Sequence, residues 1–476
     1  MSGHGNQEFL VSSTKSRDFL VFIILSIFSI VLSIITSQMG IVGGVALFVL
    51  SLSVFIVGFT MIKPVVGFYV LYIYTFFMFY IENIVSLPVP VGVFVDVLVW
   101  LVFISVLLRR RTKDLSELKN DDSMSNSIVW YIIIFSVLHD FFQIFNPLSP
   151  FGVSHTVLEF RESIYLILVF LITYRIFDSR KLIYDYTSVL LLLALVVALY
   201  GLFQEFFGLR EFEWAWLRSD PRRFELYYIW GSVRKWSVLS DPSVFGMLMA
   251  FSGIVCFVIA IGYGKLWFKV GMFSLAVVFL LAMSYSGTRT AYGMVPLGIV
   301  MYFFITLNNI KTLIISLVTT FLFLILLFGP FYGPTLNRIR STFNRNDPSM
   351  SFRDYKRDIL QDYVFSHPLG TGLGSANNVA KRLTVTADTD NGYLRTAVDK
   401  GFLGLIMQLC LYASVMIVGI RRFYLLNEKD KVLCAAFLSG VFALTFANFY
   451  QDVADQKPLN LILASVFALI LRFRTT

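Results

Sequence analysis

Charged residues are scarce in this chain of 476 residues. Asp, Glu, Lys and Arg together make up 14% of it, whereas a typical soluble domain contains about 25%. Hydrophobic residues make up 57% of the sequence. This composition excludes an ordinary soluble protein and predicts a polytopic membrane protein.

Cysteine is rare as well. The three cysteines, Cys256, Cys410 and Cys434, all lie in apolar segments. An odd number in such places argues against a disulfide framework and against a zinc site, so we expect them to be packing residues.

The first apolar run lacks a signal-peptide cleavage pattern, and no internal repeat is visible. The missing repeat argues against a transporter built from inverted halves.

Apolar runs long enough to cross a bilayer fill most of the chain. A spanning helix needs about 20 residues, and by this criterion we predict about fourteen spans. They cover residues 18–37, 41–62, 64–81, 92–108, 127–144, 160–177, 183–206, 242–262, 266–285, 291–308, 312–333, 402–420, 432–450 and 458–473. The expected fold is therefore an all-α polytopic membrane protein, with residues 1–476 forming one transmembrane domain.

The basic residues predict the orientation. Short connections rich in Lys and Arg, among them 109–113, 179–181 and 421–422, alternate so that all fall on one side of the membrane. Such loops are usually cytoplasmic, so both termini are expected there. Two long loops, 207–241 and 334–401, then lie on the extracytoplasmic side, and we expect the second to be partly helical and to carry the active site.

Both long loops are basic, which the short-loop trend does not explain. Long loops cross membranes regardless of charge, but here the cations are also patterned. In "SFRDYKRDIL" (351–360), Arg353, Lys356 and Arg357 share one helix face and could meet a diphosphate, or could form a solvated face. In "SHPLGTGLGS" (366–375), the glycine turn could approach an anion or be a plain loop.

Arg289 interrupts two apolar runs in "MSYSGTRTAYGMVPL" (283–297). A guanidinium stays protonated in proteins, and placing it at the bilayer centre costs several kcal/mol. Arg289 is therefore either a turn residue at the membrane face or a ligand for an anion. Five further ionisable residues fall near the outer ends of predicted spans and, with Arg289, ring that face: Asp96, His139, Asp140, Arg161 and Glu205.

Two more segments carry polar motifs. In "TDNGYLRTAVDKGFLGL" (389–405), Asp390 or Asn391 can cap a helix, and Arg395 follows on the same face as Asn391. In "SVRKWSVLSDPSVFG" (232–246), Arg234 precedes a helix start at Asp241 and Pro242. Aromatic residues of this first loop could form an interfacial belt, which we favour, or stack on sugars: Trp214, Trp216, Tyr227, Tyr228, Trp230 and Trp236.

Four of these motifs occur in an order that resembles the O-antigen ligase and polymerase superfamily. They are "RKWSVLSDPSVFG", "SYSGTRTAYG", "SFRD" with "HPLGTGLG", and "DNGYLRTAVDKGFLGL", spread over residues 230–405. The resemblance implies a glycosyltransferase-C type fold in the bacterial cytoplasmic (inner) membrane. It also implies a polyprenyl (undecaprenyl) diphosphate-linked oligosaccharide as donor and a sugar hydroxyl of a second glycan as acceptor.

The resemblance also suggests site residues. The arginines that match the family's diphosphate ligands are Arg234 and Arg289, followed by Arg353. Family ligases carry His-Asn where this chain has Asp390 and Asn391, and an Asp at that place favours a polymerase over a ligase. We expect Asp390, Asn391 and Arg289 to be catalytic, with these residues binding substrate: Arg234, Arg289, Arg353, Arg357, Arg395, Tyr393 and Arg161.

No metal or cofactor is expected at this site, since guanidinium groups can stabilise a departing diphosphate. The expected partners are the lipid-linked glycan, the bilayer and a chain-length regulator protein, but no nucleic acid. A flippase for the same lipid-linked glycan is the alternative from another class.

Overall fold

The computed structural model describes residues 51–84, 90–108, 123–229, 231–262, 264–307, 348–384 and 389–473, together with a few single positions elsewhere. The chain divides into two compact units, residues 1–67 and 68–476, and all contacts below lie within the second. The predicted spans 18–37 and 312–333, much of 41–62, and residues 334–347 of the second loop fall outside the described residues.

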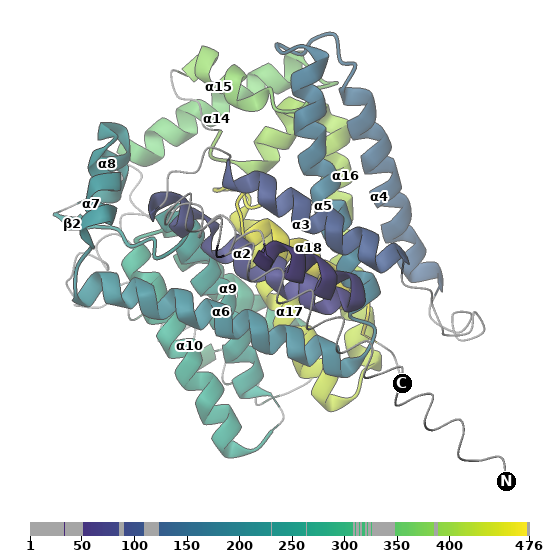
Figure 1. The fold of residues 1–476 in the computed structure, drawn as a ribbon, viewed down its shortest axis with the longest axis vertical. Coiled ribbons are helices and arrows are strands. Elements are labelled where there is room, and N and C mark those ends of the chain that lie inside the picture. Colours follow the sequence, from purple (N-terminus) through teal and green to yellow (C-terminus); the bar gives the residue numbers. More distant parts are fainter. Residues whose placement is uncertain are drawn as a thin grey trace. The chain divides into compact units, whose positions relative to one another are not determined.

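Each predicted span between 64 and 308 and between 402 and 473 corresponds to one helix (Figure 1). The helices are α2 (Pro64–Ile84), α3 (Val91–Leu108), α4 (Ser123–Gln143), α5 (Val153–Ile176), α6 (Arg180–Phe206), α9 (Pro242–Ile261), α10 (Leu266–Ser286), α11 (Arg289–Ile305), α16 (Gly392–Leu425), α17 (Glu428–Ala447) and α18 (Leu459–Ile470). Within the described residues, seven helices are long and apolar enough to cross a membrane. The all-α membrane fold is thus confirmed, whereas the total of about fourteen spans stays a prediction.

Local sequence sets the ends of these helices. Asp241 caps α9 by accepting hydrogen bonds from the backbone N–H groups of Ser243 (2.6 Å) and Val244 (3.1 Å), and Pro242 takes the first helical position. α10 ends at Gly287, whose φ of 57° gives a left-handed C-cap. The predicted helix start at Asp241 and Pro242 is therefore confirmed.

The core lies around α9 and α17. Over their most apolar windows, 83% of α9 and 72% of α17 is buried, against 22% of α10. α9 packs against α10, α11 and α17. A helix that is apolar on all sides suits such a central position, while α10 turns much of its apolar surface outward, as a lipid-facing helix does.

The first long loop has a small core of its own. It contains α7 (Glu211–Arg218), α8 (Pro221–Tyr227) and an antiparallel pair, β1 (Tyr228–Ile229) with β2 (Ser232–Val233). Leu217, Tyr227 and Trp236 pack together at its centre, and Trp236 is 1% exposed. The expected interfacial belt is wrong for Trp236 and Tyr227, because they bury their rings against each other. Trp230 lies outside the described residues.

The segment between α11 and α16 carries two helices, α14 (Pro348–Ser366) and α15 (Ala376–Thr384). Their apolar faces pack on the first turns of α16 through a cluster that includes Leu360, Val379 and Leu394. α16 starts ten residues before its predicted span and bends at Gly401, whose φ of 70° is non-helical. The short helical stretch before the bend belongs to this cluster.

A glycine turn docks on that bend. Gly370, Gly372 and Gly374 all have positive φ. The N–H groups of Thr371 and Gly372 donate to the carbonyls of Val398 and Asp399, and a Cβ at Gly370 would lie 2.4 Å from the nitrogen of Gly401. These N–H groups are used in packing, so the turn is a structural loop and not an open anion cradle.

Candidate functional site

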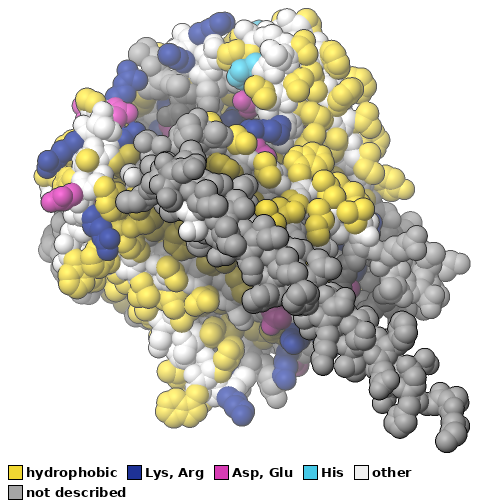
Figure 2. Space-filling model, viewed as in Figure 1, with side chains coloured by type: hydrophobic (Ala, Val, Ile, Leu, Met, Phe, Trp, Pro, Cys, Tyr) yellow, Lys and Arg dark blue, Asp and Glu magenta, His cyan; other side chains and the backbone are white. Residues whose placement is uncertain are grey.

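Basic side chains gather at one end of the second unit. Figure 2 shows Lys and Arg mainly over α7, α8, α14 and α15, whereas hydrophobic side chains cover most of the rest of the visible face. This end contains the candidate residues of both long loops. The site is therefore built from loop helices resting on the ends of the membrane helices.

Arg234 is fixed on the turn between α10 and α11. Its Nε donates to the carbonyl of Ser286 (2.9 Å) and one Nη donates to the Oγ1 of Thr288 (3.0 Å). Thr288 in turn donates to the carbonyl of Pro242 (2.9 Å). A planar guanidinium can serve both acceptors at once, so Arg234 is tied directly beside Arg289, the half-buried first residue of α11.

Arg353 of α14 acts on Arg234 across the site. Burial lowers the pKa of Arg234, and the positive charge of Arg353 lowers it further, against the opposing effect of Asp241. An anion bound near both guanidinium groups would reduce their mutual repulsion and favour the charged form of the buried Arg234. Arg234 thus links the three predicted diphosphate ligands, because it bonds the residue before Arg289 and the charge of Arg353 acts on it.

Asp390, also predicted to be catalytic, is joined to α14. Lys356, one turn beyond Arg353 and 4% exposed, places its Nζ 2.5 Å from the Oδ2 of Asp390. Asp390 adopts a φ of 55°, a left-handed conformation that Asp tolerates better than most residues. Asn391 caps α16, because its Oδ1 accepts a hydrogen bond from the backbone N–H of Leu394 (3.0 Å). Of the two candidate caps, Asn391 is the one used.

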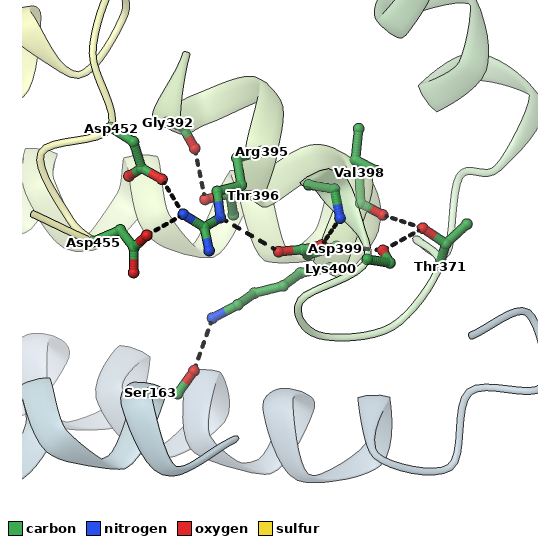
Figure 3. A network of polar contacts seen from close by, with 12 residues as sticks. Ser163, Thr371, Gly392, Arg395, Thr396, Val398, Asp399, Lys400, Asp452 and Asp455 are labelled. Carbon is green, nitrogen blue, oxygen red and sulfur yellow. Dashed lines mark hydrogen bonds and ion pairs between the residues drawn. The ribbon is translucent and has the colours of Figure 1, made fainter. Parts of the chain in front are cut away.

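Arg395 lies in a network of carboxylates (Figure 3). Its guanidinium contacts Asp452 (2.7 Å), Asp455 and Asp399 (3.9 Å). Burial raises the pKa of Asp452 above its usual range, although Arg395 opposes the rise. Burial acts on Asp455 in the same way, but there the charge of Arg395 prevails and the pKa is lowered. The charge of Arg395 is therefore already balanced by its neighbours.

Asp399 has a further structural role. It accepts hydrogen bonds from the hydroxyl of Ser375 (3.0 Å) and from the N–H of Ala376 (2.7 Å) at the start of α15. Beside it, Lys400 donates to Asp140 of α4 (2.7 Å) and reaches Ser163 of α5 (3.4 Å). These bonds fix the bend of α16 against α4 and α5.

The carboxylates open into a pocket of about 120 Å³. Arg395, Lys400 and Lys457 line it together with six acidic residues: Asp96, Glu159, Glu162, Asp399, Asp452 and Asp455. Gly392, two residues after Asp390, also lines it. Carboxylates accept hydrogen bonds from hydroxyl groups, so this acidic pocket suits a sugar better than a diphosphate.

The remaining predicted ligands are held by protein groups. The hydroxyl of Tyr393 donates to the carbonyl of Thr445 (2.6 Å). Arg161 pairs with Asp96 (2.7 Å) at the side of the acidic pocket, and Arg357 pairs with Asp354 of its own helix (3.0 Å). Arg161 therefore lies beside the acidic pocket, and Arg357 is paired within α14.

The motif analysis did not single out Asp452, Asp455 or Lys400, although Lys400 lies inside the motif "DNGYLRTAVDKGFLGL". Asp452 and Asp455 lie in the connection between α17 and α18, which contains no basic pattern and no glycine turn. Their one signal was two acidic residues three apart between apolar spans. Only the fold shows that they face Arg395.

Two comparisons with known proteins bear on this geometry. Residues 274–409 match a family model described as O-antigen ligase. This segment runs from α10 into α16 and contains Arg289, Arg353 and Asp390, whereas Arg234 precedes it. No curated protein matches the chain. The family match confirms the resemblance: residues 274–409 of this membrane protein are similar to the O-antigen ligase family.

Proposed function

We propose that the protein is a polysaccharide polymerase of the extracytoplasmic membrane face. It transfers a glycan from a polyprenyl diphosphate-linked donor to a sugar hydroxyl of a second lipid-linked glycan. The observation that supports this most concerns α14, where the charge of Arg353 acts on Arg234 and the Nζ of Lys356 pairs with Asp390. A cationic region and a carboxylate thereby belong to one site.

The cationic region provides the leaving-group half of the reaction. As the glycosidic C–O bond breaks, negative charge grows on the diphosphate, and guanidinium groups fixed in advance stabilise it without reorganising. Arg234 is held by Ser286 and Thr288 before any substrate binds. Arg289 and Arg353 complete the set, and the polyprenyl chain extends from it into the bilayer.

The acidic pocket provides the acceptor half. Its carboxylates bind the sugar hydroxyls, and the carboxylate of Asp390 accepts the proton of the attacking hydroxyl. The new glycosidic bond forms as polyprenyl diphosphate departs. Arg395, predicted from the sequence as a diphosphate ligand, here orients Asp452 and Asp455.

The product pattern tests this function. Purified protein in nanodiscs is incubated with one synthetic polyprenyl diphosphate oligosaccharide, and the lipid-linked products are separated by mass. A ladder of repeat additions with release of polyprenyl diphosphate is expected. A single addition, seen only when a different acceptor is supplied, would identify a ligase instead. Movement of intact donor across the bilayer with no new bond would identify a flippase.

A further inference from the structure

A second, larger cavity lies at the opposite end of the helices. It measures about 1010 Å³ and is bounded by α6, α9, α10 and α17. Its rim is formed at the starts of three helices, by Arg180 of α6, by Gly264 and Lys265 just before α10, and by Lys429 of α17. α6 and α10 run from this rim to the Arg234 region, so the cavity is separate from the site described above.

The rim of this cavity has excess positive charge. Its one acidic lining residue, Asp430, contacts the Nε of Arg180 (2.9 Å) and accepts a hydrogen bond from the hydroxyl of Tyr184 (3.1 Å). Lys265 and Lys429 are exposed, and no carboxylate among the described residues lies within 4 Å of either ammonium group. Two cations therefore face the cavity mouth without a counter-ion from the described part of the chain.

The interior of the cavity is apolar. Leu191 of α6, Ile259 of α9, Met272 of α10 and Leu433 of α17 line it. Next to the rim, Trp267 is 87% exposed and Leu266 is 73% exposed. An exposed Trp flanked by Lys is typical of the level of lipid headgroups. The cavity thus has its charged mouth at the headgroup level and its apolar wall along the acyl chains.

We propose that this cavity binds an anionic diacyl phospholipid, with the phosphate between Lys265 and Lys429 and an acyl chain along the apolar wall. Basic pockets between membrane helices recognise anionic headgroups in this way. A free phosphate would use only the rim, and a zwitterionic lipid would bring a second positive charge to it. The volume is at the upper end of the range for ligand sites, roughly 300–1,000 Å³.

Native mass spectrometry tests the site. The full chain is exchanged into detergent with phosphatidylglycerol or phosphatidylcholine, and retained lipid is counted. We expect selective retention of phosphatidylglycerol by the wild type and about tenfold weaker retention by the double variant Lys265→Gln with Lys429→Gln. The matched control, Lys381→Gln with Arg382→Gln, removes two exposed charges from α15 and should retain the lipid as the wild type does.

Two further arms keep the test decisive. Met272→Trp fills the apolar wall without changing the charge and should also weaken retention. Inorganic phosphate should raise the thermal midpoint less than phosphatidylglycerol does. Equal retention of both lipids, equal loss in the rim and control variants, or an equal shift with phosphate alone would overturn the proposal.

Discussion

At the scale of single residues, Arg234 is the most firmly held cation of the site. Two of its bonds go to Ser286 and Thr288, which lie more than fifty residues away in the sequence, and a third goes to the carbonyl of Leu226 (3.4 Å). A Lys at this position has three donors on one nitrogen, so it lacks the planar fork that reaches Ser286, Thr288 and a phosphate oxygen from separate nitrogens. The geometry of the guanidinium, and not its charge alone, is therefore expected to matter.

Arg234→Lys should lower kcat/KM for transfer by about 100-fold, the usual effect of removing one fixed donor from a site of developing negative charge. Arg289→Lys should act in the same direction. Initial rates with the synthetic lipid-linked donor measure both. Arg222→Lys, an exposed Arg in the same loop, is the control and should stay within about twofold of the wild type. Unchanged rates in the Arg234 and Arg289 variants would remove the diphosphate-binding role.

The proposed role of Asp390 as a base can be separated from its ion pair with Lys356 by a double variant. Asp390→Asn leaves the buried Lys356 without its carboxylate, which should lower the free energy of unfolding by about 3 kcal/mol. Adding Lys356→Met should restore most of this stability, since no buried charge remains. If Asp390 is the base, transfer stays lost in the double variant although the thermal midpoint recovers. Recovery of both transfer and stability would show that Asp390 only pairs with Lys356.

At the scale of secondary structure elements, the bend of α16 sets the geometry of the acidic pocket. Before the bend, Arg395 and Asp399 face the α17–α18 connection and the start of α15. At the bend, the chain of α16 touches the glycine turn so closely that the N–H of Phe402 donates to the carbonyl of Pro368 (3.0 Å). The bend thus joins the second loop to the membrane helices.

Gly401→Ala should therefore destabilise the protein. Its φ is 70°, and a Cβ there would lie 2.4 Å from the carbonyl oxygen of Pro368. We expect a loss of about 1–3 kcal/mol, seen as a lower thermal midpoint in detergent. The matched control is Gly271→Ala in α10, where a Cβ has open space and the midpoint should rise slightly. If Gly401→Ala had the same thermal midpoint as Gly271→Ala, the bend would accommodate a side chain without strain and the prediction would be wrong.

At the scale of the whole molecule, basic residues from three parts of the chain meet at one end of the helices. Arg180 at the start of α6, Lys265 before α10 and Lys429 at the start of α17 line one cavity. The Arg234 region and the start of α16 lie at the other ends of the same helices. The grouping is a feature of the fold, whereas its assignment to the cytoplasmic side stays a prediction from the charge bias.

Labelling from outside the cell checks that assignment. In a Cys410→Ser background, the remaining cysteines, Cys256 and Cys434, are buried. Asp358→Cys on α14 should react with an impermeant thiol reagent in intact cells if the second loop is extracytoplasmic, as the charge bias predicts. Arg421→Cys, exposed at the far end of α16, should react only after permeabilisation. The reverse pattern would place the active site in the cytoplasm.

The sequence by itself determined the spans, the caps and the nature of the candidate ligands. Spans and caps depend on neighbours within one or two helical turns, so hydropathy predicted the spans that the structure describes and Asp241 with Pro242 predicted the start of α9. For α16 the sequence offered Asp390 or Asn391 as the cap. The resemblance added Arg234, Arg289 and Asp390 as candidates. Whether those residues bind a diphosphate or take a proton stays a prediction.

Only the tertiary structure decided which charges meet. Lys356 pairs with Asp390 across 34 positions of sequence, and Arg395 pairs with Asp452 across 57. Helical spacing gives the face on which a residue lies but not the element that covers that face. The structure therefore pairs Arg395 with carboxylates and packs the rings of Tyr227 and Trp236 on each other. It also forms the basic rim of the 1010 Å³ cavity from the start of α6, the residues before α10 and the start of α17. Each of these outcomes depends on the packing of distant helices, which local pattern does not encode.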